Sequence, residues 1–222
     1  MSGAAGSSQW MYATGYEVGQ SLRFEDGSAP ELTRTFPSAG NRKTWTWSGW
    51  VKSGANDTTG QLEMFGAGTA ATNFTMFYIT KSTAGDPDTL LFYDYNAPTD
   101  YGWQSKIRLR DPSAWYHIMC VVDTTISSPA ADRVKFYVNG VRQSDIETDY
   151  GDLAEDYESH INNNIEHNIG KYPSNAQYYD GYLAEVHFID GQALTPADFG
   201  ETGDYGEWKP IEYSGTYGTN GF

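Results

Sequence analysis

The chain has 222 residues, and its 14 Lys and Arg stand against 29 Asp and Glu, which gives a formal net charge of −15. This charge excludes nucleic acid and anionic lipid as expected partners, because both need Lys and Arg at the contact. No apolar run approaches the roughly 20 residues of a membrane-spanning helix, so membrane insertion is not expected either.

Aromatic residues make up 15% of the chain and 24 glycines supply turns, which favours strands over long helices. Alternation of polar and apolar residues predicts strands, in chain order, at 21–25, 43–52, 73–80, 90–94, 107–110, 115–123, 133–138 and 181–189. The segment 115–123 is apolar on both faces, which is typical of a strand covered on both sides. Asn139-Gly140 predicts a tight type I′ hairpin after 133–138.

The remaining segments are expected to be turns, loops and one short helical turn. Thr195-Pro196-Ala197-Asp198 has an N-cap hydroxyl, a first-turn proline and an acid, which predicts a helical turn over 195–200. The glycine-rich run 66–71 is interpreted as a turn, and 53–60, 82–87 and the acidic stretch 145–164 as loops. We expect a lead over 1–15, followed by a single domain over 16–222.

Four ordered motifs carry a resemblance to a known family. They are WYHIMCVVD (115–123), VKFYVNG (134–140), HNIG (167–170) and YDGYLAEVHFIDGQALT (179–195). In this order and spacing they resemble the laminin-G-like branch of the concanavalin A-like lectin/glucanase family. The resemblance implies an all-β fold, a two-sheet antiparallel jelly-roll sandwich.

A narrower resemblance rests on GNRKTWTWSGWVK (40–52), FIDGQAL (188–194), WKP (208–210) and YGTNGF (217–222). These look like laminin-G-like modules in structural proteins of tailed viruses that infect marine bacteria. The resemblance implies a location in the virion, on a fibre, an appendage or the capsid surface, and carbohydrate binding. In such proteins YGTNGF commonly runs on into more sequence, so the chain is either a short version or a piece of a longer protein.

The sequence lacks the carboxyl pattern of the glucanases of this fold. Glycoside hydrolysis needs two carboxyls, and the glucanases of this fold place them on one strand as E-x-D-x-x-E. The closest spacing here is Glu147, Asp149 and Asp152, in which Gly151 interrupts the strand and the last acid differs. We therefore expect a non-catalytic protein.

Calcium is a candidate cofactor, since hard cations bind carboxylate, amide and carbonyl oxygens. The acidic stretch supplies such groups in Asp145, Asp149, Asp152, Asp156 and Asn162 to Asn164, without the spacing of an EF-hand. The alternative is a charged, hydrated loop that binds no metal.

Two aromatic groups are candidate carbohydrate-binding surfaces, because sugar rings stack their C–H faces on Trp and Tyr. The first, beside Asp94, Asn96 and Asp100, comprises Tyr93, Tyr95, Tyr101 and Trp103. The second comprises Tyr172, Asn175, Tyr178 and Tyr179. The alternative for both is core packing or a protein interface, where Tyr and Trp are also enriched.

These observations together predict a non-catalytic recognition module of a virion that binds host-surface glycan. Its expected partners are other virion proteins and further copies of itself, whose repetition multiplies weak contacts. Two other functions stay open: a purely architectural capsid or tail protein, and an enzyme that degrades host polysaccharide.

Overall fold

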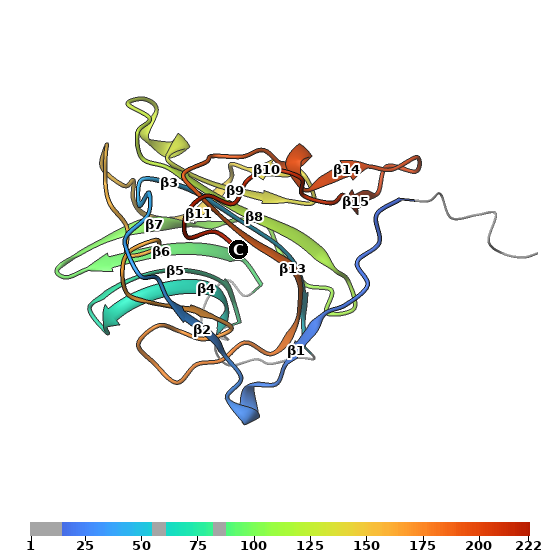
Figure 1. Cartoon of the computed structure of the whole chain (residues 1–222), viewed down its shortest axis with the longest axis horizontal. Helices are drawn as coiled ribbons and strands as arrows, with labels where there is room; N and C mark the ends of the chain where they lie inside the picture. The colour runs from blue at the N-terminus through green and yellow to red at the C-terminus, as the bar shows by residue number, and fades with distance from the viewer. Residues whose placement is uncertain (1–14, 55–60, 82–87) are drawn as a thin grey trace, which may run out of the picture.

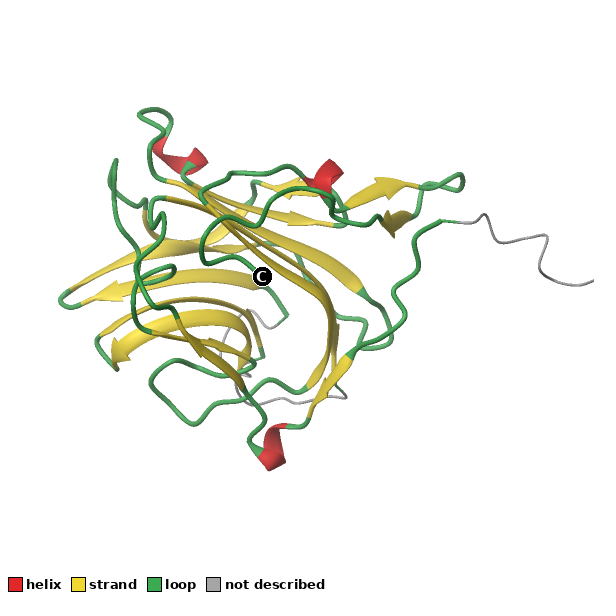
Figure 2. Ribbon diagram, viewed as in Figure 1, coloured by secondary structure: helices red, strands yellow, loops and turns green. Residues whose placement is uncertain are grey.

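The computed structural model describes residues 15–54, 61–81 and 88–222. Within these residues, two antiparallel sheets lie face to face and enclose the hydrophobic core (Figure 1). In the described part of the chain, helix is confined to three short 3₁₀ turns (Figure 2): η2 (Asp26–Ser28), η3 (Ala130–Asp132) and η4 (Pro196–Asp198). The expected all-β jelly-roll sandwich is confirmed.

Six described strands form the first sheet. Their order is β1 (Leu22–Phe24), β13 (Gly181–Asp190), β3 (Thr44–Ser53), β8 (Tyr116–Asp123), β9 (Val134–Val138) and β10 (Val141–Gln143). The predicted strands at 21–25, 43–52, 115–123, 133–138 and 181–189 all lie in this sheet, with ends shifted by one residue at most. Asn139 and Gly140 both have positive φ, as a type I′ hairpin turn requires.

Seven described strands form the second sheet. Their order is β11 (Ile146–Gly151), β7 (Thr99–Ser105), β6 (Leu90–Asn96), β5 (Asn73–Thr80), β4 (Gln61–Ala70), β12 (Glu166–Ile169) and β2 (Leu32–Thr35). A separate ribbon pairs β14 (Gly200–Thr202) with β15 (Trp208–Pro210). No helix in the described part of the chain is long and apolar enough to cross a membrane.

The core forms because alternate residues of facing strands point inward. On β3, Trp45, Trp47 and Val51 are buried between the sheets, and the Trp47 ring meets Phe77 of β5 edge-on at 5.1 Å. Trp50 points to the opposite, outer face, as the alternation predicts. Burial of such aromatic side chains is the main favourable term for the sandwich.

Strand β8 is covered on both faces, as its sequence predicts. Ile118 and Cys120 belong to the core between the sheets. Met119 and Val121 point outward and pack against Phe199 and other residues of the C-terminal segment. The segment after β13 therefore adds a partial third layer over the six-stranded sheet.

Two sequence-based expectations about strands are wrong. Residues 107–110 do not belong to a strand. They form an irregular segment, in which Leu109 is buried and its N–H donates to the Asp88 carbonyl. The alternation of polar and apolar residues there comes from the burial of side chains such as Leu109, and the backbone is not paired as a strand. Conversely, Ile146–Gly151 within the acidic stretch forms edge strand β11. Its alternation is hidden because nearly all its side chains are exposed.

The glycine-rich run 66–71 is also not a turn, because residues up to Ala70 lie in β4. A Cβ at Gly66 would lie 2.8 Å from Met76 Cβ and from Pro173 Cγ. The glycine is therefore needed for close packing within a strand rather than for a chain reversal. Residues 1–14 of the predicted lead 1–15, residues 55–60 of the predicted loop 53–60 and all of the predicted loop 82–87 lie outside the described residues. Ser53 is the last residue of β3.

The helical turn at 195–200 is confirmed as η4. The Asp198 carboxylate accepts hydrogen bonds from the Thr195 N–H at 2.8 Å and from the Thr195 hydroxyl at 2.9 Å. Pro196 occupies the first helical position, where no N–H is needed.

Candidate functional site

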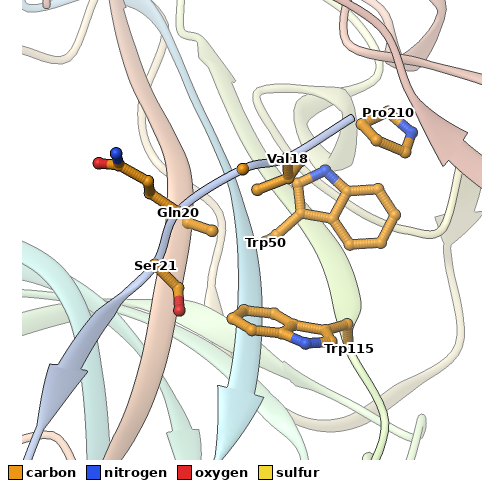
Figure 3. Close-up of a pocket in the computed structure, with 8 residues that line it drawn as sticks. Val18, Gln20, Ser21, Trp50, Trp115 and Pro210 are labelled. Carbon is orange, nitrogen blue, oxygen red and sulfur yellow. The ribbon is translucent and has the colours of Figure 1, made fainter. Parts of the chain in front are cut away.

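A cleft of about 360 Å³ opens on the outer face of the six-stranded sheet (Figure 3). Its floor is a row across two strands, since Ala184 of β13 lies opposite Trp50 of β3. Its lining within the described residues is Val18, Gly19, Gln20, Ser21, Trp50, Trp115, Ala184 and Pro210. We call this the tryptophan cleft. None of these described lining residues carries a charge.

The two indoles reach the cleft from different strands and are fixed from behind. The Trp50 ring lies 5.3 Å from the ring of His117, its cross-strand neighbour on β8. Trp115 immediately precedes β8, is 36% exposed, and contacts the Tyr182 ring edge-on at 6.3 Å. The Arg23 guanidinium in turn lies 5.2 Å from the centre of the Tyr182 ring. Both indoles are thus held in place while part of their surface stays exposed.

The buried imidazole of His117 fixes another wall of the cleft. Trp208 of β15 donates its indole N–H to His117 Nδ1 at 3.1 Å, so Nδ1 is unprotonated. The proton of the neutral ring is therefore on Nε2, which donates to Ser48 Oγ at 2.8 Å. Burial lowers the pKa of His117 to about 4. Ser48 and His117 are consequently no nucleophile–base pair, and their role is to position β15 and its Pro210.

Residues 15–21, which we call the strap, form the remaining wall. Tyr16 donates its hydroxyl to Glu185 Oε2 at 2.8 Å, and this bond raises the pKa of Tyr16 to about 12. Glu185 lies at an irregularity of β13 and has a φ of +47°. The strained backbone turns its carboxylate toward the strap.

The first predicted aromatic group is divided by the alternation of the seven-stranded sheet. Tyr93 pairs with Gly102 and Asp94 with Tyr101, so Tyr93 and Tyr101 point to opposite faces. Tyr93 and Tyr95 lie on the outer face, next to Phe74. Tyr101 and Trp103 point inward, and Trp103 packs in the core against Phe136 at 5.1 Å. These four residues form no single surface.

The second predicted group is also divided. Tyr179 is fully buried in the core, and its hydroxyl donates to the Lys52 carbonyl at 3.0 Å. Tyr172 packs on Phe74 at 5.1 Å, and Tyr178 is half-buried with its ring 5.9 Å from Lys171 Nζ. Asn175 is exposed and its Oδ1 accepts a hydrogen bond from the N–H of Ala176.

Two of the acidic residues proposed for calcium, Asp149 and Asp156, have their own partners in the chain. Asp149 accepts the N–H of Gly151 at 2.8 Å, and Asp156 pairs with Lys43 at 3.2 Å. Desolvation raises the pKa of Asp152, with a smaller contribution from Asp149. Asp145 accepts the Lys106 N–H through its backbone carbonyl. Among the described residues, no group of three or more His, Cys, Asp and Glu side chains is placed to hold a metal ion.

Asn162, in contrast, belongs to a buried network that we call the clasp. Asp190 Oδ1 accepts hydrogen bonds from Asn162 Nδ2 at 2.6 Å and from the Asn41 N–H at 2.8 Å, while Oδ2 accepts the Asn220 N–H at 3.1 Å. A Cβ at Gly40 would lie 2.5 Å from Asp190 Oδ2, so only glycine fits there. The clasp therefore joins three of the sequence motifs, 40–52, 188–194 and 217–222, through Asn41, Asp190 and Asn220.

Glu63 is an isolated buried acid on the outer face of β4. It is 0% exposed, neither of its carboxylate oxygens has a hydrogen-bond partner, and desolvation raises its pKa to about 8. A raised pKa is a property of catalytic general acids. Glu63 is nevertheless sealed from solvent and lies on the other sheet from the cleft.

Sequence reasoning placed Trp50 and Trp115 in or next to strands but missed them as site residues. A usable signal was present at Trp50. In 43–52, Trp45, Trp47 and Val51 share one face, so Trp50 is a large apolar side chain on the face that otherwise carries polar or small residues. An outward-pointing tryptophan of this kind indicates a contact with something beyond the sandwich.

Comparisons with known proteins agree with the geometry of the fold. A family model described as the concanavalin A-like lectin/glucanases superfamily, in its laminin G form, matches residues 19–199. No curated protein matches. Among solved structures, a heptameric SAP-like pentraxin from Limulus polyphemus is 18% identical, with a TM-score of 0.50, and 75% of this chain and 71% of that chain are covered.

A second solved structure is the full-length tailspike protein 2 from Escherichia coli O157:H7 bacteriophage CAB120. It is 14% identical, with a TM-score of 0.54, over 80% of this chain and 23% of the tailspike. At such identities the likeness shows the fold alone. The family model, however, matches most of the chain. The chain therefore belongs to the laminin-G-like branch of the concanavalin A-like lectin/glucanase superfamily.

Proposed function

We propose that this protein is a non-catalytic recognition module that binds carbohydrate in the tryptophan cleft. The observation that carries the proposal is the pairing of two outward indoles, Trp50 and Trp115, in one uncharged hollow. Sugar rings have apolar C–H faces that pack on indoles, and Gln20 and Ser21 supply polar groups for hydroxyls. The volume of about 360 Å³ lies at the lower end of the roughly 300–1,000 Å³ typical of small-molecule sites.

The non-catalytic part of the proposal is supported by the composition of the cleft. Glycoside hydrolysis needs two carboxyls at the bond that breaks. The described lining of the cleft contains no carboxyl, and the buried acid with a raised pKa, Glu63, lies on the other sheet.

We further propose that the module is carried on a virus particle. Two observations support this location: the resemblance of 40–52, 188–194 and 217–222 to modules of tailed viruses, and the likeness of the fold to part of a bacteriophage tailspike. A shallow site of this size binds one glycan weakly. Repeated copies in a homo-oligomer, held by other virion proteins, strengthen the attachment through avidity.

A glycan array tests the proposed function. The protein is compared with Trp115→Ala and with the matched control Tyr205→Ala, which removes a 97% exposed aromatic side chain outside the cleft. We expect binding of the wild type and of the control, and loss of binding in Trp115→Ala with an unchanged melting temperature. No binding by the wild type, or equal binding by both variants, would contradict the proposal.

A further inference from the structure

We propose that the tryptophan cleft selects uncharged sugars and rejects glycans that present a carboxylate, such as uronic acids. The inference rests on the proposed function and deepens it by naming the ligand class. It is carried by three observations: the described lining is uncharged, the neighbouring cations face partners in the chain, and an acid lies at the adjoining hollow.

The lining provides no counter-charge for an anion. Trp50, Trp115, Val18 and Pro210 supply apolar surface, and the polar groups come from the strap. A sugar that stacks there loses water from the face in contact. Hydroxyls at its rim can stay hydrated or meet Ser21, whereas a carboxylate that loses water without a partner is strongly disfavoured.

Cations that lie next to the cleft face partners in the chain. Lys52, two residues after Trp50 on the outer face of β3, acts on Asp111, whose pKa is lowered by hydrogen bonds from Ser113 and by the charge of Lys52. Arg23 donates to Tyr182 Oη at 3.2 Å, to Asp180 Oδ1 at 3.4 Å and to the Phe24 carbonyl at 3.1 Å. Lys209, which precedes Pro210, pairs with Glu201 at 3.5 Å. Recruiting Arg23 or Lys209 to an anionic ligand requires breaking these contacts, so neither of these two offers a ready partner.

A negative charge lies just beyond the strap. A second hollow of about 190 Å³ shares Gln20, Ser21 and Ala184 with the tryptophan cleft, and its lining includes Glu185. The Glu185 carboxylate accepts from Tyr16 and lies 3.5 Å from His187 Nε2, while burial lowers the pKa of His187. His187 is therefore neutral at pH 7, and the charge of Glu185 is not cancelled. The net charge of −15 adds to this repulsion.

Matched ligand pairs that differ only at C6 test the inference. The probes are methyl β-glucoside against methyl β-glucuronide, and methyl β-galactoside against methyl β-galacturonide, titrated at pH 7 and followed by NMR. In whichever pair enters the cleft, we expect the neutral glycoside to bind at least about tenfold more tightly than the acidic one, because the carboxylate is desolvated without a partner. Added salt should reduce the ratio of the two affinities but not bring it to one, since salt screens the repulsion from the protein's negative charge and does not remove the cost of desolvation.

A charge placed in the lining should change this preference. Gly19 has an ordinary φ, and a Cβ there would meet nothing within 4 Å, so Gly19→Lys introduces a cation without strain. We expect Gly19→Lys to tighten binding of the acidic member several-fold. The matched control Thr148→Lys adds the same charge at an exposed position of β11 and should leave the ratio unchanged.

The outcomes separate the two proposals. An acidic member that binds the wild type as tightly as its neutral counterpart overturns the inference, while glycan binding in the cleft stands. Absence of binding by all four probes and on the glycan array would overturn the proposed function and the inference together. A Gly19→Lys protein that behaves like Thr148→Lys would show that charge in the cleft does not set the preference.

Discussion

The clasp and the tryptophan cleft are built on opposite principles. In the clasp, three polar donors converge on the buried carboxylate of Asp190 and tie distant parts of the chain together. In the cleft, two large apolar side chains stay partly exposed, and no partner within the described chain covers them completely. Satisfied buried polar groups stabilise a fold, whereas exposed apolar surface is available for a partner. We therefore expect changes in the clasp to affect mainly stability and changes in the tryptophan cleft to affect mainly binding.

The largest expected effect comes from breaking the clasp. Asp190→Ala leaves the donors of Asn41, Asn162 and Asn220 unpaired in the interior, which should lower the free energy of unfolding by about 3–5 kcal/mol. Urea denaturation measures the loss, with Asp204→Ala, an exposed carboxylate, as the control. A loss no larger than that of the control would show that the clasp is not a stabilising network.

Two tryptophans of the same strand sharpen the comparison. Trp47→Ala opens a cavity in the core and should cost about 3–5 kcal/mol of stability. Trp50→Ala, three residues along on the outer face, should cost much less and yet abolish glycan binding. Thermal melts and glycan titrations of both variants provide the check. If Trp50→Ala destabilises the protein as much as Trp47→Ala, the cleft is a structural feature.

Glu63 tests what an unsatisfied buried group does to stability. Its pKa is about 8 in the folded chain against an ordinary 4.5, so as the pH rises the unfolded chain loses this proton first. The free energy of unfolding therefore falls as the pH rises from about 4.5 to about 8, because over this range the folded chain still holds the Glu63 proton that the unfolded chain has lost. Glu63→Gln should stabilise the protein by a few kcal/mol at pH 8.5 and by little at pH 4.5. An equal effect at both pH values would contradict the raised pKa.

His117 links stability to pH with the opposite sign. Its pKa is about 4 in the folded chain against an ordinary 6.5, so as the pH falls the unfolded chain takes up this proton first. Stability is consequently lost as the pH falls from about 6.5 to 4, by about 1–3 kcal/mol. His117→Gln should flatten this part of the urea-midpoint profile; an unchanged slope would assign the loss to other groups, such as His167, whose pKa is also lowered by burial.

The smallest effect is expected from removal of calcium. Because the carboxylates of Asp149 and Asp156 have separate partners in the chain, we expect EDTA to leave the melting temperature unchanged. A ligand that binds only the folded chain raises its stability. A clear fall in the melting temperature with EDTA, restored by added Ca²⁺, would instead support the calcium site predicted for Asp145, Asp149, Asp152 and Asp156.

The sequence predicted the fold better than the site, and particular residues show why. Alternation in Trp45, Trp47 and Val51 marks an inward face directly, because burial itself produces the pattern. Strand β11 lacks that signal since neither of its faces is buried, and it was missed. Residues 107–110 carry the alternating pattern and are nevertheless an irregular segment.

The predicted aromatic groups rest on closeness in the sequence, and the structure divides each group between different surfaces. Tyr93 and Tyr101 are eight residues apart and lie on adjacent strands, yet the register sends them to opposite faces. The cleft instead joins Trp50, Trp115, Pro210 and the strap, whose juxtaposition depends on strand order and on how the Trp208 indole meets His117. No local pattern encodes that arrangement.

Indole N–H signals in a nitrogen–proton NMR spectrum provide the most direct test of where a sugar binds. On titration with the neutral methyl glycosides, the account predicts shifts of the Trp50 and Trp115 signals, whereas those of the core residues Trp45 and Trp47 stay in place. Binding that leaves the Trp50 and Trp115 signals unmoved would contradict it.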